Sequence, residues 1–211
     1  MQTTLAPALP ANLTESPSHH SLRSPEGRIM VDLETLGQTP GSLLFAIGAV
    51  RFDGPGCTDD PQEWDFFYRR IDPRSCERLG LKADIDTVLW WLKQGDAARA
   101  EVCRPGDPLE DVLRDYAAWL GDTNEVEIWG NGPSFDSSLL AAAYRAAGLP
   151  VPWKFWSERC YRTTKSLFPH IKAEEGKTAH KAINDAMAQA IHARRILAAV
   201  AALQSESRHH A

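Results

Sequence analysis

The amino-acid sequence predicts an α/β fold with a mixed sheet and helices on both of its faces. Three apolar segments joined by short links come first, between residues 29 and 71. Consecutive strands with short connections favour an antiparallel meander. Helical and strand-like segments then alternate along the rest of the chain. That alternation adds helices to both faces of the sheet, so we expect a layered α/β domain.

The composition is that of one globular domain without a membrane segment. The 211 residues suffice for a single domain, and no apolar run approaches membrane-spanning length. The N-terminus also lacks the charged and apolar regions of a signal peptide. The net charge of −5 argues against broad binding of duplex nucleic acid but leaves a narrow site for a single strand open. Four scattered cysteines without a CxxC pair favour a reducing cytoplasm over disulfides or a zinc site.

The chain divides into one folded domain and two tails. Residues 1–27 are rich in Pro, Ser, Thr and Ala without any period, a composition that favours disorder. We expect the folded domain over 28–204 and a short C-terminal tail over 205–211. All candidate site residues fall inside the folded domain.

The expected strands are short apolar runs that end in turn residues. The first, at 29–35, precedes a loop that contains glycines. The second, at 43–52, stops at an Asp-Gly-Pro-Gly sequence. A third run, at 62–71, is rich in aromatic residues, and a short fourth strand covers 126–129.

The expected helices show apolar residues three and four positions apart. Ile85, Val88 and Leu92 show this spacing in the first helix. Gly148 and Pro150 mark the end of an Ala-rich helix. The helices are expected over 84–102, 107–120, 134–147, 158–168 and 179–204.

Asp32 and Glu34 are the first candidate site residues. They stand one residue apart near the end of the first strand, so both side chains point to one face of the sheet. Two carboxylates held this close repel each other, and burial adds a desolvation cost. A hard divalent cation such as Mg²⁺ or Mn²⁺ between them offsets both penalties. A strand edge whose polar residues face water would explain the pair equally well.

Asp136 and Asp185 stand near the starts of two helices, and His180 stands five residues before Asp185. Asp136 follows a strand and a Gly-Asn-Gly-Pro turn, at the sheet edge where α/β folds build sites. Taken alone, helix capping is the better explanation for Asp136. A first-turn acid also explains Asp185, and a solvated loop explains His180. His180 and Asp185 reach one centre only if His180 lies in the loop before the helix.

The order of these residues is more specific than any one of them alone. The chain reads Asp32-x-Glu34, then Asp136, then His180-x₄-Asp185. This pattern resembles the DEDDh 3′–5′ exonucleases of the RNase H-like (DnaQ-like) superfamily.

Further motifs extend the resemblance over roughly residues 29–200. Lys181 stands where another branch of the superfamily has a tyrosine, which favours the histidine branch. The chain is similar to the phage DexA-type and mycobacterial 3′–5′ exoribonuclease-like family. The motifs that carry this similarity are DLETLG at 32–37, IGAV at 47–50, WWLKQ at 90–94, WGNGPSFD at 129–136 and RT at 162–163.

The resemblance implies an RNase H-like fold with a five-stranded mixed sheet and a 3′–5′ exonuclease activity. The implied substrates are single-stranded RNA or DNA, or short oligonucleotides, cut to nucleoside 5′-monophosphates. It implies two Mg²⁺ or Mn²⁺ ions per active site, one held by Asp32, Glu34 and Asp185. Asp32 would bridge to the second ion, which Asp136 holds, and His180 would be the general base. Related enzymes also suggest a homodimer.

A non-catalytic nucleic-acid-binding module on the same fold is the alternative function. The presence of all four acids and the histidine argues against it, because degenerate members of such families usually lose some of them. A metal-dependent release of mononucleotides would separate the two functions.

By the same resemblance, six residues contact the substrate strand. Leu36 would pack on the terminal base, and the backbone near Gly37 would meet the 3′-hydroxyl. Ordinary core packing is the alternative for Leu36 and for the adjacent Trp90 and Trp91. The basic segment 154–181 could follow the phosphate backbone or be a solvated face. The six residues are Thr35, Leu36, Gly37, Trp91, Phe135 and Arg162.

Overall fold

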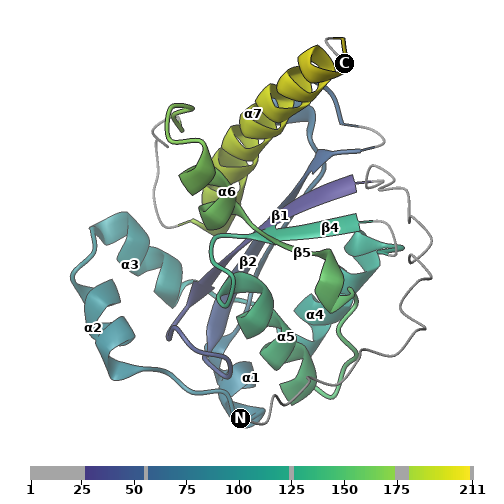
Figure 1. Ribbon diagram of the computed structural model, residues 1–211. Coiled ribbons are helices and arrows are strands. Elements are labelled where there is room, and N and C mark those ends of the chain that lie inside the picture. The colour runs from purple at the N-terminus through teal and green to yellow at the C-terminus, as the bar shows by residue number, and fades with distance from the viewer. Residues whose placement is uncertain (1–26, 55–56, 124–125, 174–180, 210–211) are drawn as a thin grey trace, which may run out of the picture.

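The computed structural model describes residues 27–54, 57–123, 126–173 and 181–209 (Figure 1). The tail expected over 1–27 lies outside the described residues except for Gly27, and His180 lies outside them too. Within those four segments, no helix combines the length and the apolar character that crossing a lipid bilayer requires.

A five-stranded sheet forms the centre of the fold. Its strands are β1 (Gly27–Thr35), β2 (Leu44–Asp53), β3 (Phe66–Arg70), β4 (Val126–Gly130) and β5 (Glu158–Cys160). They lie in the order β3-β2-β1-β4-β5. The β1–β2 and β2–β3 pairs are antiparallel, whereas β4 pairs in parallel with both β1 and β5. The predicted mixed sheet is therefore confirmed.

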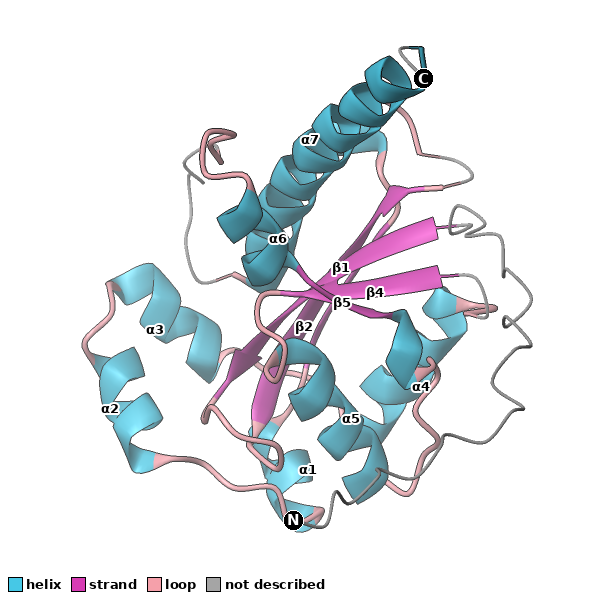
Figure 2. Cartoon of the chain, in the orientation of Figure 1, coloured by secondary structure: helices cyan, strands magenta, loops and turns pink. Residues whose placement is uncertain are grey.

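Helices cover both faces of this sheet (Figure 2). The first face carries α1 (Pro73–Arg78), α4 (Leu109–Leu120) and α5 (Asp136–Ala146), and the second carries α6 (Tyr161–Leu167) and α7 (Ala182–His209). The side chains of β1 alternate between the two apolar cores: Ile29 and Val31 pack on the first face and Met30 on the second. Asp32 and Glu34 share the parity of Met30, so they face α7.

The packing of α4 follows from its apolar period. Leu109, Val112, Leu113 and Tyr116 recur at steps of three and four residues, and all four are fully buried. The helix ends at Gly121, whose positive φ of 66° suits a glycine. The helix predicted over 107–120 is thus confirmed, apart from its first residues.

The segment predicted as one helix over 84–102 forms two helices, α2 (Ile85–Leu92) and α3 (Asp96–Cys103). Asp84 begins α2, since its side chain accepts hydrogen bonds from two backbone N–H groups of the first turn. Gly95 is the N-cap residue of α3 and has extended backbone angles. The prediction of a single helix was wrong, because the first helix ends at Leu92 and a second helix begins at Asp96. The two helices form a separate pair at one side of the domain (Figure 1).

Short elements account for the remaining differences from the sequence-based expectation. The segment 158–168, expected to be helical, begins with the three-residue strand β5, too short to show an alternating pattern. Short helical turns at Pro61–Glu63 and Phe155–Ser157, and the helix α1, were not predicted. The last helix runs to His209, into the residues expected as a C-terminal tail. No Gly or Pro follows Gln204 to end it.

Candidate active site

Three carboxylates from two elements converge at one point. Asp32 and Glu34 come from the carboxyl-terminal half of β1, and Asp185 comes from the first turn of α7. Each offers an oxygen, and these oxygens all lie within 4.8 Å of one another. The alternative of a strand edge open to water is excluded for Glu34, which is only 7% exposed.

Gly48 explains why α7 can bring Asp185 so close. Gly48 lies directly opposite Asp32 in the β1–β2 ladder. A Cβ atom at this position would stand 2.3 Å from the carbonyl carbon of Ala182 and 2.3 Å from the backbone nitrogen of Ile183. Only glycine leaves room for the start of α7 against the backbone of β2.

Asp136 lies at the start of α5, just beyond the end of β4. Its side chain is 1% exposed, and Oδ2 accepts a 2.7 Å hydrogen bond from the backbone N–H of Asn131. A Cβ at Gly130 would come within 3.0 Å of this carboxylate. The lack of a side chain at Gly130 therefore leaves the space that the Asp136 carboxylate fills. Because the carboxylate turns back to the loop before the helix, a helix-capping role alone does not account for its position.

The pKa values of three of these acids are raised, by burial in each case and by repulsion from neighbouring acids for Asp32 and Glu34. Burial, followed by the charges of Asp185 and Glu101, raises the pKa of Glu34 to about 8. Burial raises the pKa of Asp136 to about 6. Burial and then the charges of Asp136, Glu34 and Asp185 raise the pKa of Asp32. The ionised cluster is therefore costly in the protein by itself.

The donor set fits a hard divalent cation. In the described part of the chain, Glu34 Oε1 and Asp136 Oδ1 are buried without a hydrogen-bond partner. Buried polar atoms seldom stay unpaired, so these two oxygens suit a metal ion as their partner. An all-oxygen site with several negative charges is the type that Mg²⁺, Mn²⁺ and Ca²⁺ prefer. Asp32, Glu34 and Asp185 would hold one ion, with Asp136 on the adjacent side.

Gln189 also belongs to the cluster, although the sequence analysis did not single it out. Its side-chain amide nitrogen donates a 2.8 Å hydrogen bond to Asp32 Oδ1. Gln189 stands four residues after Asp185 on α7, so both side chains lie on the same face of the helix. That spacing was the only available sequence signal, and a lone glutamine on a helix carries little information.

A cavity of about 820 Å³ adjoins the carboxylates. Its walls come from the end of β1, from α2, from the loop before α5 and from the start of α6. Four of the six predicted substrate-contacting residues line it, namely Thr35, Trp91, Phe135 and Arg162. Glu34 lines the same cavity, so the acidic cluster and the predicted substrate residues meet at one place.

Leu36 and Gly37 are not among the described residues that line this cavity. Leu36 is partly buried and packs against apolar side chains of two core clusters. Gly37 is buried, and a Cβ there would stand 2.4 Å from Ser42 Oγ. Core and turn packing therefore accounts for the positions of both residues.

The two adjacent tryptophans, Trp90 and Trp91, differ in how far they are exposed. Trp91 is 5% exposed, and its indole N–H donates a 2.9 Å hydrogen bond to the carbonyl oxygen of Thr35. It thus fixes the carboxyl end of β1 beneath the cavity. Trp90 is 44% exposed and lines the cavity. Its ring meets the ring of Trp91 edge to face, with the two ring centroids 5.0 Å apart. Trp90, which was not among the predicted contacts, presents the more accessible ring.

Arg162 stands at the other wall of the cavity. Its guanidinium lies over Gly132, where a Cβ would be 3.7 Å from Arg162 Cζ. Its positive charge acts on Asp136 and lowers the pKa of that carboxyl, against the larger effect of burial. A cation here can bind a phosphate oxygen next to the acids. His180 itself lies outside the described residues; the Nζ of the next residue, Lys181, stands 5.1 Å from the ring centroid of Tyr68.

Comparison with known proteins agrees with this site. The chain matches the family model described as the 3'-5' exoribonuclease Rv2179c-like domain over residues 27–197. No curated protein sequence is significantly similar to it. Two crystal structures have a similar fold: cell-death related nuclease 4 (CRN-4), and the nuclease domain of 3'hExo, a DEDDh family member, bound to rAMP.

The two structural similarities confirm the RNase H-like fold. CRN-4 aligns with a TM-score of 0.55 and 12% identity, over 82% of this chain and 64% of CRN-4. The chain thus spans less than two thirds of CRN-4. The 3'hExo domain aligns with a TM-score of 0.53 and 14% identity, over 82% of this chain and 92% of that domain. The family match, with which the fold and the acidic cluster agree, shows that this chain belongs to the 3'-5' exoribonuclease Rv2179c-like domain family.

Proposed function

We propose that this protein is a 3′–5′ exonuclease that removes nucleotides one at a time from the 3′ end of single-stranded RNA or DNA, or of short oligonucleotides, and releases nucleoside 5′-monophosphates. The observation that supports this most is the convergence of Asp32, Glu34 and Asp185 beside a cavity of about 820 Å³. The cavity has room for a terminal nucleotide, since typical small-molecule sites have ~300–1,000 Å³.

We propose two Mg²⁺ or Mn²⁺ ions as the cofactors. When bound, they would supply an activated water and stabilise charge on the phosphate and on the leaving oxygen. Asp32, Glu34 and Asp185 would hold one of them and Asp136 would help to hold the other. The unpaired buried oxygens of Glu34 and Asp136 support this assignment.

The remaining steps belong to side chains of this chain. Trp90 and Phe135 line the cavity and would hold the terminal base by stacking. Arg162 would bind an oxygen of the phosphate that is cut. His180, just before α7, would take the proton from the attacking water, a task suited to an imidazole near neutral pH.

An assay of the purified protein tests this proposal. Its substrates are end-labelled single strands of RNA and of DNA with matched sequence. With Mg²⁺ or Mn²⁺ we expect stepwise shortening from the 3′ end and release of 5′-mononucleotides, and with EDTA no hydrolysis. His180→Ala is expected to lower turnover by roughly 10²–10⁴ without weakening metal binding. Tight strand binding without metal-dependent hydrolysis would indicate the non-catalytic binding module instead. A homodimer and a cytoplasmic location stay predictions, and light scattering of the pure protein tests the first.

A further inference from the structure

Two large aromatic side chains stand out from the surface just before β5. Phe155 is 79% exposed and Trp156 is 62% exposed, and their ring centroids lie 5.0 Å apart, edge to face. Both belong to the short helical turn Phe155–Ser157. Aromatic residues exposed side by side to this extent usually mark a binding surface, because each forfeits the burial that its ring could gain.

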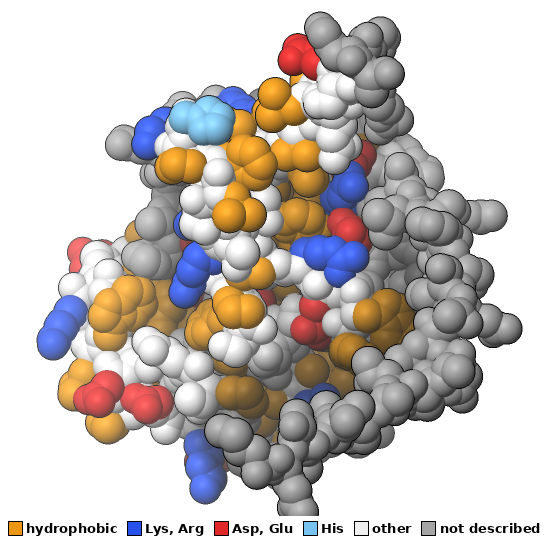
Figure 3. Space-filling view, in the orientation of Figure 1, with side chains coloured by type: hydrophobic (Ala, Val, Ile, Leu, Met, Phe, Trp, Pro, Cys, Tyr) orange, Lys and Arg blue, Asp and Glu red, His pale blue; other side chains and the backbone are white. Residues whose placement is uncertain are grey.

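Cationic residues stand close to this pair in the sequence. The segment 154–165 carries four Lys or Arg and one acid, on a chain whose net charge is −5. The acid, Glu158, accepts a 2.9 Å hydrogen bond from the indole N–H of Trp153, so it is held by a buried side chain. Figure 3 shows apolar and Lys or Arg side chains next to one another on the face that carries β5. The four cations are Lys154, Arg159, Arg162 and Lys165.

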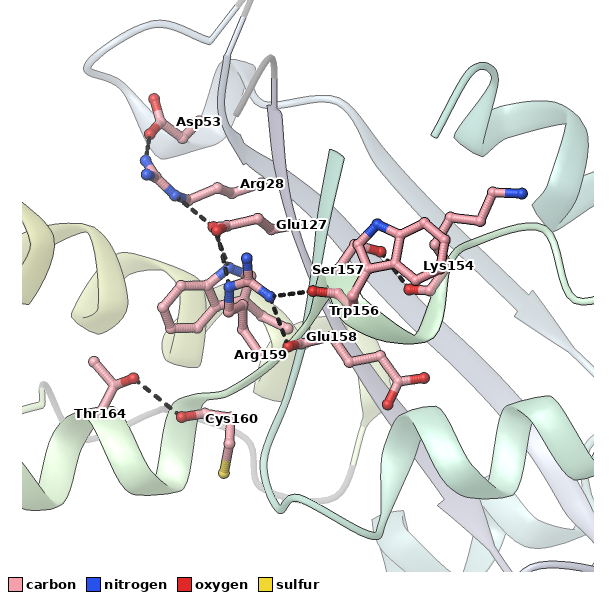
Figure 4. Close-up of polar contacts among 11 residues, drawn as sticks. Arg28, Asp53, Glu127, Lys154, Trp156, Ser157, Glu158, Arg159, Cys160 and Thr164 are labelled. Atoms are coloured by element: carbon pink, nitrogen blue, oxygen red, sulfur yellow. Dashed lines mark hydrogen bonds and ion pairs between the residues drawn. The ribbon is translucent and has the colours of Figure 1, made fainter. Parts of the chain in front are cut away.

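Arg159 is fixed against the backbone of Trp156 and Glu158 (Figure 4). Its Nε donates a 2.9 Å hydrogen bond to Glu127 on β4, and its Nη1 donates to the carbonyl oxygens of Trp156 at 2.8 Å and Glu158 at 2.9 Å. Arg28 binds the second oxygen of the same glutamate. These contacts hold the turn that carries Phe155 and Trp156 against the edge of the sheet, so the pair is a preorganised feature.

The strand β5 connects this surface to the active site. It runs parallel to β4, whose carboxyl end leads to Asp136, and Arg162 in the cavity wall stands two residues after its end. The three residues of β5 span about 10 Å. A single-stranded nucleic acid with its 3′ end in the cavity can therefore reach the aromatic pair. The nucleotides that would lie there are those that precede the one being removed.

We propose that Phe155 and Trp156, with Lys154 and Arg159 beside them, bind the upstream nucleotides of a single-stranded substrate. The bases stack on the two rings, and the backbone phosphates lie along the cations toward Arg162. Stacking on aromatic rings accepts every base, as an exonuclease that moves along a strand needs. The positive charge of this segment favours a nucleic acid over an apolar peptide as the occupant. This inference rests on the proposed function.

Steady-state kinetics on two substrates test the inference. A long single strand reaches the aromatic pair, whereas a dinucleotide fills only the cavity and the metal site. For the double variant Phe155→Ala, Trp156→Ala we expect KM for the long strand to rise about tenfold or more, with kcat and both constants for the dinucleotide unchanged. The conservative variant Trp156→Phe should keep most of the affinity for the long strand. Phe66→Ala is the matched control, since Phe66 is 58% exposed on β3 at the opposite edge of the sheet.

A binding measurement keeps the inference separate from the proposed function. Fluorescence anisotropy of a labelled single strand in EDTA should show the same loss of affinity in the double variant even if no preparation hydrolyses nucleic acid. Equal changes for the long strand and the dinucleotide would mean that the pair only supports the fold around the site. Unchanged affinity for the long strand would overturn the inference, as would self-association of the wild type that the double variant abolishes.

Discussion

Gln189 on α7 holds the carboxylate of Asp32 on β1 through a 2.8 Å hydrogen bond from its amide nitrogen to Oδ1. In the described part of the chain, the carbonyl oxygen of the same amide is buried without a hydrogen-bond partner. The bond joins the helix that carries Asp185 to the strand that carries Asp32 and Glu34. It therefore fixes how the two halves of the acidic cluster face each other. Hydrogen bonds to the side chains that ligate a metal ion affect how tightly the site binds that ion.

Gln189→Leu is expected to weaken Mn²⁺ binding and lower turnover by roughly 10–100-fold while leaving the fold intact. Leucine keeps much of the volume but donates no hydrogen bond, so the Asp32 carboxylate can rotate. Isothermal titration with Mn²⁺ and initial rates on a single strand measure both effects. Gln204→Leu, at an exposed position of the same helix, is the control. Wild-type metal affinity in Gln189→Leu would show that the hydrogen bond has no part in the site.

Asp32→Asn and Asp185→Asn are each expected to abolish hydrolysis and to raise the melting temperature of the metal-free protein. Each change removes one negative charge from a cluster whose members repel one another in a buried setting. Thermal unfolding in EDTA and rates in Mg²⁺ measure the two effects, with the exposed Asp111→Asn as control. A variant that keeps near wild-type turnover would remove its residue from the metal site.

Gly48→Ala is expected to lower the free energy of unfolding by about 1–3 kcal/mol or more, and to lower activity with it. The added methyl group would stand 2.3 Å from the backbone at the start of α7, so the helix must move and carry Asp185 away from Asp32. Gly95→Ala is the matched control, because its Cβ would meet open space and its φ is −62°. Denaturant melts and initial rates compare the two variants; equal stability of both would contradict the role of Gly48.

The metal-free protein is expected to lose stability as the pH rises from about 4.5 to 8. Glu34 has its pKa raised from 4.5 to about 8, and Asp136 has its pKa raised from 3.8 to about 6. Between these values the folded chain binds more protons than the unfolded chain, so the free energy of unfolding falls with increasing pH. Melting temperatures in EDTA across this range measure the effect. Mg²⁺ or Mn²⁺ should restore more stability at pH 8 than at pH 5, and a metal effect independent of pH would speak against these carboxylates as ligands.

The sequence alone predicted the parts of the fold that have a clear period or a clear motif. The apolar run of β1 and the helical spacing of α4 both matched the structure, because β1 packs on both of its faces and α4 buries one continuous apolar face. The order of Asp32, Glu34, Asp136 and Asp185 resembles that of the DEDDh exonucleases and so implied one cluster. The structure brings ligand oxygens of Asp32, Glu34 and Asp185 within 4.8 Å of one another, and Asp136 lies close enough for its charge to raise the pKa of Asp32.

Features that depend on tertiary contacts were not predictable in this way. β5 has three residues, and only pairing with β4 makes it a strand. Gln189 became part of the site through a contact across 157 positions of the chain, which no local pattern shows. Trp90 and Trp91 could not be told apart, because the choice depends on the hydrogen bond from Trp91 to Thr35.

The need for a free 3′-hydroxyl tests the central claim most directly. The end of β1 and the loop before α5 line a cavity beside the acids, and under the proposed function we expect the terminal nucleotide there, with its 3′ end near Glu34 and Thr35. A 3′-phosphate would add negative charge beside the carboxylates at a range where salt does not fully screen it. The measurement is the time course of 5′-labelled single strands in Mg²⁺, with either a 3′-hydroxyl or a 3′-phosphate, beside a circular strand of the same sequence. We predict a descending ladder from the 3′-hydroxyl strand, much slower decay of the 3′-phosphate strand and an intact circle; equal decay of the two linear strands, or cutting of the circle, would contradict the assignment of this site to 3′–5′ exonuclease chemistry.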